Sequence, residues 1–385
     1  MHLRNYKYSE FPGMPQAWEV EKFSLDEVNL LVGQNASGKS RVLNTIVALS
    51  MFLGRAQPMT WRSGHWELTL SDETNVMIIT LDVEDGKVVG ERLTLNGNDK
   101  LLREGVGGGS LWYEKQQEMV EFAIPETTVA MIARRDSLQH PYLEPLFAWA
   151  ERIRFYHFST DLGRQTLHLV SPDTKPSNFD ADGEVKAVVD PNAVVEQYSS
   201  GYQKFSDPFD HAILADLASI GYDCEDVAAV HAEGMPFIGG NLPIMLQVKE
   251  RDLAVPTTQF NMSTGMFRAL AIIIHLNYSL MSGIRSTILI DDIGEGLDFA
   301  RSKSLINLII DKCRDSKVQI IMTSNDRFVM NEVSLEYWHV LSRSGGTVSI
   351  FDRNNSQREF ESFKYLGLSN FDFFTSGAFR GPVIH

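Results

Sequence analysis

The residues best suited to chemistry form one short segment, GQNASGKS, at positions 33–40. It matches the pattern GxxxxGK[ST], in which glycines let the backbone curl so that its N–H groups face phosphate oxygens. Lys39 would reach the β and γ phosphates of a nucleotide, and the Ser40 hydroxyl would bind Mg²⁺. A glycine turn that only caps a helix is the alternative. The predicted nucleotide-binding residues are Gly33, Gln34, Asn35, Ala36, Ser37, Gly38, Lys39, Ser40 and Arg41.

This pattern needs a buried strand before it and a helix after it. The run VNLLV at 28–32 is short and wholly apolar apart from one Asn, which predicts a buried parallel strand. From Ser40 to Leu53 apolar residues recur at close to helical spacing, which predicts a helix. Both neighbours therefore agree with a phosphate-binding loop.

A second candidate segment, STILIDD at 286–292, is an apolar run that ends in two aspartates. Carboxylates at the C-terminal end of a buried parallel strand lie at the edge where phosphate loops also lie. We expect Asp291 to hold Mg²⁺ and Asp292 to orient the attacking water. A strand that simply ends in a polar turn is the alternative.

A third segment, FNMSTGMFRAL at 260–270, places small polar residues directly before an apolar helix. The backbone N–H groups at the start of that helix could bind an anion. The alternative is an N-cap, in which Ser263 or Thr264 only ends the helix, and the two roles are compatible.

Together these segments resemble the motifs of ABC-type ATPases, and the amino-terminal segment is similar to that of the SMC, RecF and OLD group. IDDIGEGLD (290–298) resembles the Walker B motif and D-loop, and Ser263 and Gly265 match the signature LSxG. The resemblance implies Mg²⁺ and ATP as cofactors. It also implies a head-to-tail dimer in which ATP lies between the phosphate loop of one copy and the signature of the other. The nucleotide-contacting residues it adds are Ser263, Thr264, Gly265 and Asp298.

Three positions depart from the family pattern. The catalytic glutamate corresponds to Asp292, which is one methylene shorter, so Glu295 is a further candidate. The switch histidine corresponds to Asn325, which can hydrogen-bond a phosphate but cannot carry a proton. No glutamine stands out as the Q-loop residue, with Gln139 and Gln165 as weak candidates. These changes predict slow hydrolysis.

The predicted fold class is α/β, a P-loop NTPase of the ABC-ATPase head type with an antiparallel β subdomain and a helical insertion. Residues 1–60 and 255–385 would form the ATPase core, 61–135 the β subdomain and 136–254 the insertion, with a mobile loop near 171–192. The alternation after Ser286 predicts a largely parallel sheet.

Smaller segments give further expectations. Residues 202–230 are predicted to be helical and Gln259–Met262 extended. Trp338 is interpreted as a packing residue. The four phenylalanines of the C-terminal segment either dock a partner or fold back onto the core, and these are Phe371, Phe373, Phe374 and Phe379.

The composition of the chain disfavours several classes of function. Thirty-five Lys and Arg against fifty Asp and Glu give a net charge of −15, which disfavours a protein that coats nucleic acid. A local DNA or RNA patch remains open through five arginines, with salt-bridged arginines as the alternative: Arg134, Arg135, Arg152, Arg154 and Arg164. The two cysteines, Cys224 and Cys313, form no metal motif and fit a reduced cytoplasmic setting. No apolar stretch is long enough to cross a bilayer.

The sequence thus predicts a cytoplasmic ATPase without an appended nuclease. It would form ATP-dependent dimers or higher oligomers and regulate a separate protein effector, a nuclease or toxin, in DNA-related or anti-phage defence. Two alternatives stay open. One is a slowly or non-hydrolysing ATP-gated scaffold that sequesters a toxin or nuclease, and the other is a RecF-like DNA-repair ATPase.

Overall fold

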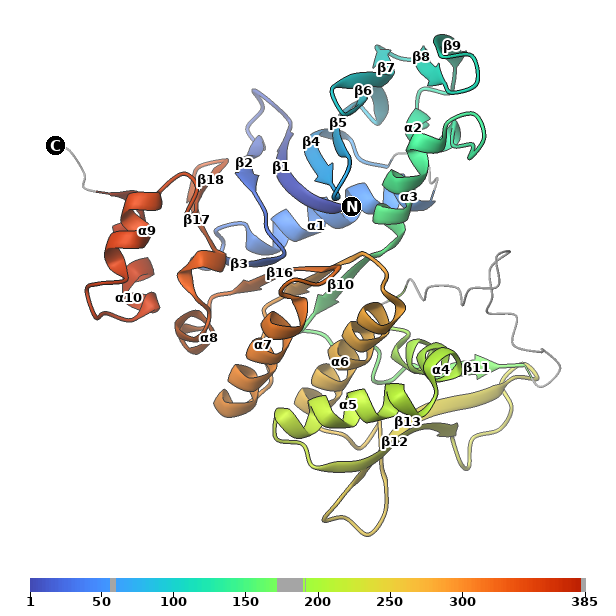
Figure 1. Cartoon of the computed structure of the whole chain (residues 1–385), viewed down its shortest axis with the longest axis vertical. Helices are drawn as coiled ribbons and strands as arrows, with labels where there is room; N and C mark the ends of the chain where they lie inside the picture. Colours follow the sequence, from blue (N-terminus) through green and yellow to red (C-terminus); the bar gives the residue numbers. More distant parts are fainter. Residues whose placement is uncertain (56–59, 172–189, 191, 382–385) are drawn as a thin grey trace. The chain divides into compact units, whose positions relative to one another are not determined.

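The computed structural model describes residues 1–55, 60–171, 190 and 192–381, and the chain divides into two compact units (Figure 1). The first unit comprises Met1–Ile153, Arg285–Thr287 and Gln319–His385. The second comprises Arg154–Ile284 and Ile288–Val318. The loop expected near 171–192 falls almost wholly outside the described residues.

The first unit is built on one mixed sheet. Its strand β3 (Val28–Val32) pairs in parallel with β16 (Val318–Ser324) and β17 (Trp338–Ser344). β18 (Thr347–Phe351) pairs antiparallel with β17 and in parallel with β2 (Trp18–Ser24). The sheet continues, antiparallel throughout, through β1 (His2–Glu10), β4 (Ser63–Ser71), β5 (Val76–Glu84), β6 (Lys87–Leu95), β7 (Asn98–Glu104), β8 (Gly108–Tyr113) and β9 (Glu118–Ala123).

The parallel pairing of β16, β3 and β17 confirms the parallel arrangement that the alternation after Ser286 predicts. The predicted antiparallel β subdomain is also present, as strands β4–β9, which join the same sheet through β1. Short turns connect these successive strands, and such turns can join only antiparallel neighbours.

Strand β3 and helix α1 (Lys39–Arg55) form as the sequence predicts. All five residues of β3 are buried, as expected for a strand covered on both faces. Helix α1 is fixed to the sheet through Thr45, whose hydroxyl accepts a hydrogen bond from Tyr6 at 2.8 Å and whose carbonyl accepts one from the Trp66 indole at 3.2 Å. Helix α1 also contacts α2 (Ala130–Ala133) and α3 (Glu144–Glu151), the latter preceded by the turn η1 (Pro141–Leu143).

The C-terminal part of the first unit folds back onto the core. It consists of α8 (Arg327–Glu332), η2 (Leu335–Tyr337), α9 (Gln357–Phe363), α10 (Asn370–Thr375) and η3 (Ala378–Arg380). Phe373 and Phe379 are buried, and the Phe373 ring packs 4.8 Å from the ring of Phe360. Trp338 is also buried, which confirms its packing role.

The second unit pairs β10 (Ile153–His157) with β15 (Ser286–Asp291) and contains a smaller antiparallel sheet. In that sheet β13 (Leu242–Glu250) lies between β11 (His168–Val170) and β12 (Cys224–His231), and β14 (Thr257–Thr258) also pairs with β13. Helices α4 (Val194–Phe205), α5 (Asp207–Ser219) and α6 (Thr264–Ser282) pack on one another, and α4 and α5 contact β12, as Figure 1 shows. Helix α7 (Phe299–Cys313) contacts α5.

Two local expectations for this unit are wrong. Residues 224–230 form strand β12 rather than helix, because β13 supplies a paired strand for them and tertiary pairing overrides weak helical periodicity. Residues 259–262 form a turn rather than a strand. There the Gln259 backbone amide still donates to the Leu246 carbonyl at 2.8 Å, but the Gln259 side-chain oxygen accepts from the Leu246 amide at 2.7 Å in place of a backbone carbonyl. The Gln259 side-chain amide donates to the Arg164 and Thr166 carbonyls.

Three helices of the second unit are joined by a buried polar cluster. Lys312 on α7 forms an ion pair with Asp216 on α5, and Asn277 on α6 hydrogen-bonds both side chains. Each polar group thereby has a partner, which offsets the cost of its burial. Among the described residues, no helix combines the length and the apolar character that crossing a lipid bilayer requires.

Candidate functional site

The loop between β3 and α1 has the backbone that phosphate binding requires. Gly38 has φ +103° and Ala36 φ +63°, so the chain turns sharply before the helix. At Gly33 a side chain would collide with the Ser37 hydroxyl and lie 3.1 Å from the Leu341 carbonyl oxygen. Glycine is therefore required at two points of the curl, once for φ and once for space.

Lys39 lies at the first position of helix α1 and is buried. Its Nζ donates to the carbonyl oxygens of Gly33 at 2.9 Å and Gln34 at 3.3 Å, so the ammonium bridges the start of its own loop. The Ser37 hydroxyl is buried and has no hydrogen-bond partner in the part of the chain that the structure describes. The helix N-terminus, the cation and this hydroxyl together fit a phosphate group.

Side chains from other elements of the first unit hydrogen-bond residues of this loop. Asn325, which follows β16, donates a hydrogen bond from its amide to the side-chain oxygen of Asn35. Arg343 of β17 donates to the Ala36 carbonyl at 3.2 Å. Arg41 instead forms an ion pair with Glu10 of β1, and its guanidinium lies 4.2 Å from the centre of the Trp18 ring of β2. It therefore joins the start of helix α1 to these two strands.

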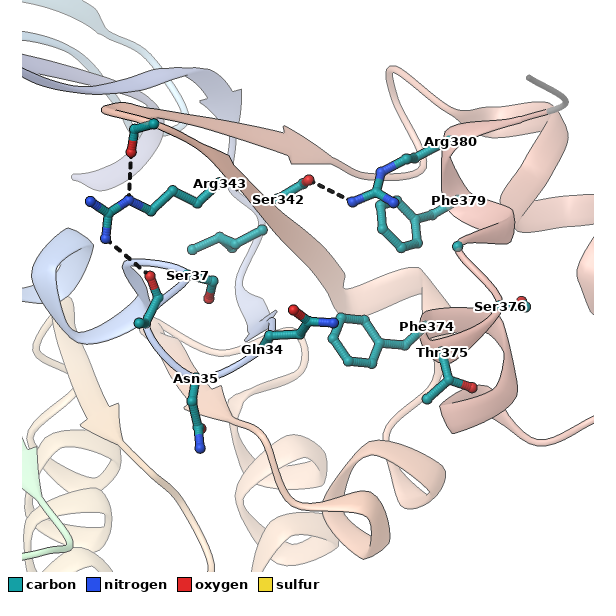
Figure 2. Close-up of a pocket in the computed structure, with 14 residues that line it drawn as sticks. Gln34, Asn35, Ser37, Ser342, Arg343, Phe374, Thr375, Ser376, Phe379 and Arg380 are labelled. Atoms are coloured by element: carbon teal, nitrogen blue, oxygen red, sulfur yellow. Dashed lines mark hydrogen bonds between the residues drawn. The ribbon is translucent and has the colours of Figure 1, made fainter. Parts of the chain in front are cut away.

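A pocket of about 400 Å³ opens beside the loop (Figure 2). Its walls are formed by residues of the loop itself, of the end of β17 and of the C-terminal segment. Arg343 was not predicted as a site residue, and the C-terminal segment was considered only as a docking or packing element. No sequence signal linked either to the loop, because the link is a tertiary contact.

The acidic segment lies in the second unit. Asp291 ends β15, is buried, and its carbonyl accepts a hydrogen bond from the Phe158 amide at 3.1 Å. Its carboxylate lies 3.4 Å from Nδ1 of His157, a residue that no sequence motif indicates. Asp292 has φ +54°, in the left-handed region that Asp tolerates better than most residues.

The predicted signature packs directly on the loop that follows Asp292. Ser263 is the N-cap of the 19-residue helix α6, where its hydroxyl accepts from the Met266 amide at 3.2 Å, so the capping alternative is correct as a local structure. Thr264 is the first helical residue. A Cβ on Gly265 would lie 2.6 Å from the Gly296 carbonyl oxygen, so only glycine permits this approach.

Arg268 joins the same two segments from one helical turn further on. It is buried, and its guanidinium donates to the Glu295 carbonyl at 2.8 Å and to the Thr160 carbonyl at 2.8 Å. Burial lowers the pKa of Arg268 from its ordinary value. The Glu295 backbone is therefore fixed, while its side chain is exposed.

Asp298 is the N-cap of helix α7. Its carboxylate accepts from the Arg301 amide at 3.1 Å and pairs with the Arg301 guanidinium at 2.8 Å, and the backbone hydrogen bond is the main reason that its pKa is lowered. Arg301 also lies 4.4 Å from the centre of the Tyr222 ring. Tyr222 and Arg301 are thus two further residues in contact at this predicted D-loop, and the sequence did not indicate either of them.

Three of the five arginines expected to form a nucleic-acid patch are held by hydrogen bonds or an ion pair. Arg135 pairs with Glu144, Arg134 donates to the Ala123 carbonyl, and Arg164 donates to the Met262 carbonyl. Arg154 is buried. These contacts fit salt-bridged and packed arginines better than a free patch. Gln139 and Gln165 are both exposed.

A protein-family model described as "AAA domain, putative AbiEii toxin, Type IV TA system" matches residues 130–331, more than half of the chain. The chain belongs to this family of AAA-domain proteins. The matched range contains the signature segment and the acidic strand, and it begins after the phosphate loop. No curated protein matches the sequence.

Solved structures agree on the fold. The SMC head bound to the C-winged helix domain of ScpA matches with a TM-score of 0.52 and 13% identity, covering 91% of this chain and 97% of that chain. The SMC head domain with an extended coiled coil bound to the C-terminal domain of ScpA, from Pyrococcus furiosus, matches with a TM-score of 0.52 and 11% identity, covering 94% and 100%. This AAA-domain protein therefore has the α/β P-loop fold of SMC heads, as the sequence predicts.

The packing of Gly265 on Gly296 gives a direct stability test. We expect Gly265→Ala to lower the free energy of unfolding by about 1–3 kcal/mol, because the new methyl group must displace backbone rather than a flexible side chain. Chemical denaturation monitored by circular dichroism measures this. Thr264→Ala, one residue earlier, is the matched control and should cost less than about 1 kcal/mol. Equal costs for the two variants would contradict the close approach.

Proposed function

We propose that this protein is an ATPase that binds Mg-ATP on residues 33–40 and hydrolyses it slowly. The observation that carries the proposal is the buried ammonium of Lys39 at the helix N-terminus, held on the Gly33 and Gln34 carbonyls. The AAA-domain family supports the same activity.

In this proposal each part of the loop has a separate task. The backbone N–H groups of the loop bind the phosphates, and Lys39 exchanges its carbonyl acceptors for phosphate oxygens. Ser40 and Asp291 hold Mg²⁺ through a hydroxyl and a carboxylate, both of which are ligand types that this ion prefers. Asp292 orients the attacking water and accepts its proton. Asn325, bonded to Asn35, would contact the terminal phosphate.

We further propose that the signature of one copy completes the site of another. Ser263, Thr264 and Gly265 present the N-terminus of helix α6, whose unpaired N–H groups and partial positive charge suit a second set of phosphate oxygens. Asp298 follows on the adjoining loop. Two copies joined head to tail by ATP would separate after hydrolysis.

The regulated partner is proposed to be a protein effector. The description of the family names a type IV TA system, which supports a role in bacterial defence. The SMC heads with this fold are bound to a protein, ScpA, which supports a partner surface on the fold. Because the net charge of the chain is −15, most of its surface would repel nucleic acid. A protein or peptide is therefore the favoured partner.

Two departures from the family pattern favour the scaffold alternative. Asp292 is shorter than the glutamate of the family and lies at a positive φ, and Asn325 cannot transfer a proton. A site of this kind would hold ATP for long periods, so that the bound state rather than turnover would control the effector.

The first test concerns nucleotide binding. Lys39→Ala should weaken Mg-ATP binding at least about tenfold, because a charged hydrogen bond to phosphate contributes about 1.5–3 kcal/mol. Isothermal titration calorimetry measures the affinity. Lys22→Ala is the matched control, since this exposed lysine pairs with Glu67 on the sheet and its loss should leave the affinity unchanged. Unchanged binding in Lys39→Ala would refute the nucleotide site.

The second test concerns hydrolysis. Asp292→Asn keeps a residue that tolerates positive φ but removes the carboxylate, so we expect ATP binding to persist and turnover to fall roughly a hundredfold. Phosphate release under saturating Mg-ATP measures the rate. Glu295→Gln is the comparison, and it should retain most of the activity. The reverse pattern would assign the proton acceptor to Glu295, and no turnover in the wild-type protein would support the scaffold.

A further inference from the structure

The pocket beside the phosphate loop lies wholly within the first unit (Figure 2). Residues of three segments line it: 34–37 of the loop, 341–345 at the end of β17 and 374–380 of the C-terminal segment. Asn35, which hydrogen-bonds Asn325, is one of the lining residues. Under the proposed function the terminal phosphate of ATP lies against these two side chains, so a phosphate released by hydrolysis would leave beside the pocket.

Two arginines line this pocket without a carboxylate to balance their charge. Neither Arg343 nor Arg380 forms an ion pair within the part of the chain that the structure describes, and none of the lining residues is an aspartate or glutamate. Exposed arginines elsewhere in the first unit, such as Arg92 and Arg353, pair with aspartates. In a chain with a net charge of −15, two uncompensated cations in one pocket indicate an anionic ligand.

Hydrogen bonds hold both guanidinium groups at the pocket, as the dashed lines in Figure 2 show. Arg380 donates to the Ser342 hydroxyl at 2.7 Å. Arg343 donates to the Ala36 carbonyl at 3.2 Å and to the Gly345 carbonyl at 2.8 Å. Because a guanidinium has five N–H donors, these bonds leave donors on each arginine for a further acceptor.

A buried hydroxyl that lacks an acceptor also lines the pocket. Ser37 is 6% exposed, and its Oγ forms no hydrogen bond with any of the described residues. A buried polar group of this kind is costly unless something pairs with it. An anion held by the two arginines could accept a hydrogen bond from this hydroxyl.

We infer that this pocket is a second anion site, which binds the inorganic phosphate released by hydrolysis. The site itself is argued from Arg343, Arg380 and Ser37, and the identity of its anion rests on the proposed function. A phosphate ion offers several oxygens to arginine donors, which bind such groups through paired N–H contacts. The volume of about 400 Å³ admits a phosphate together with bridging water. Phosphate held here would delay product release and so slow turnover.

The test measures the binding of inorganic phosphate to the full chain by titration calorimetry, with the loop saturated by Mg²⁺ and the non-hydrolysable ATP analogue adenylyl imidodiphosphate. Because the analogue occupies the loop, only a site outside it can take the phosphate, and we expect saturable binding. Arg380→Gln, which removes the charge, should weaken phosphate binding about tenfold, whereas Arg380→Lys, which keeps it, should stay within about threefold of the wild-type protein. Both variants should bind the analogue as the wild-type protein does.

Arg358→Ala is the matched control, since Arg358 is an exposed arginine of the C-terminal segment, on α9, and does not line this pocket. It should leave phosphate binding unchanged. Absence of phosphate binding by the analogue-saturated wild-type protein would overturn the inference. An equal loss in Arg380→Gln and Arg358→Ala would also overturn it, because the effect would then come from the overall charge. Failure of the wild-type protein to bind the analogue would instead refute the proposed function.

Discussion

The curl of residues 33–40, between a buried strand and a helix, is the backbone constraint on which the proposed site depends. The curl needs glycine at Gly33, where a side chain would collide with Ser37, and at Gly38, where φ is +103°. Because helix α1 begins at Lys39, directly after the curl, the curl places the helix N-terminus and the Lys39 ammonium together, and this is the arrangement that the proposed phosphate site uses. The burial of β3 and the anchoring of Thr45 keep the two ends of the curl in place.

In the second unit, too, glycine permits a close approach between two backbone segments. Gly265 lets the start of helix α6 approach the Gly296 carbonyl, and Arg268 then fixes the loop that contains Glu295. The predicted signature and the segment after Asp292 consequently pack directly on each other.

The sequence predicted those features that local pattern controls. β3, α1, α6 and the alternation after Ser286 follow from apolar periodicity and glycine placement, and the structure confirms them. The strand at 224–230 could not be predicted, because its identity depends on pairing with β13, which lies further along the chain. The Phe374 and Arg343 walls of the pocket were missed for the same reason. The proposed roles of the motif residues remain predictions.

The most direct test of the central claim, that ATP joins the phosphate loop of one copy to the signature of another, is the mass of the protein in solution with and without Mg-ATP. The account predicts that sedimentation velocity of Asp292→Asn gives twice the mass of one chain in saturating Mg-ATP and one chain without it. Lys39→Ala and Ser263→Arg should each remain at the mass of one chain. An Asp292→Asn protein that binds ATP tightly without any increase in mass would contradict the account.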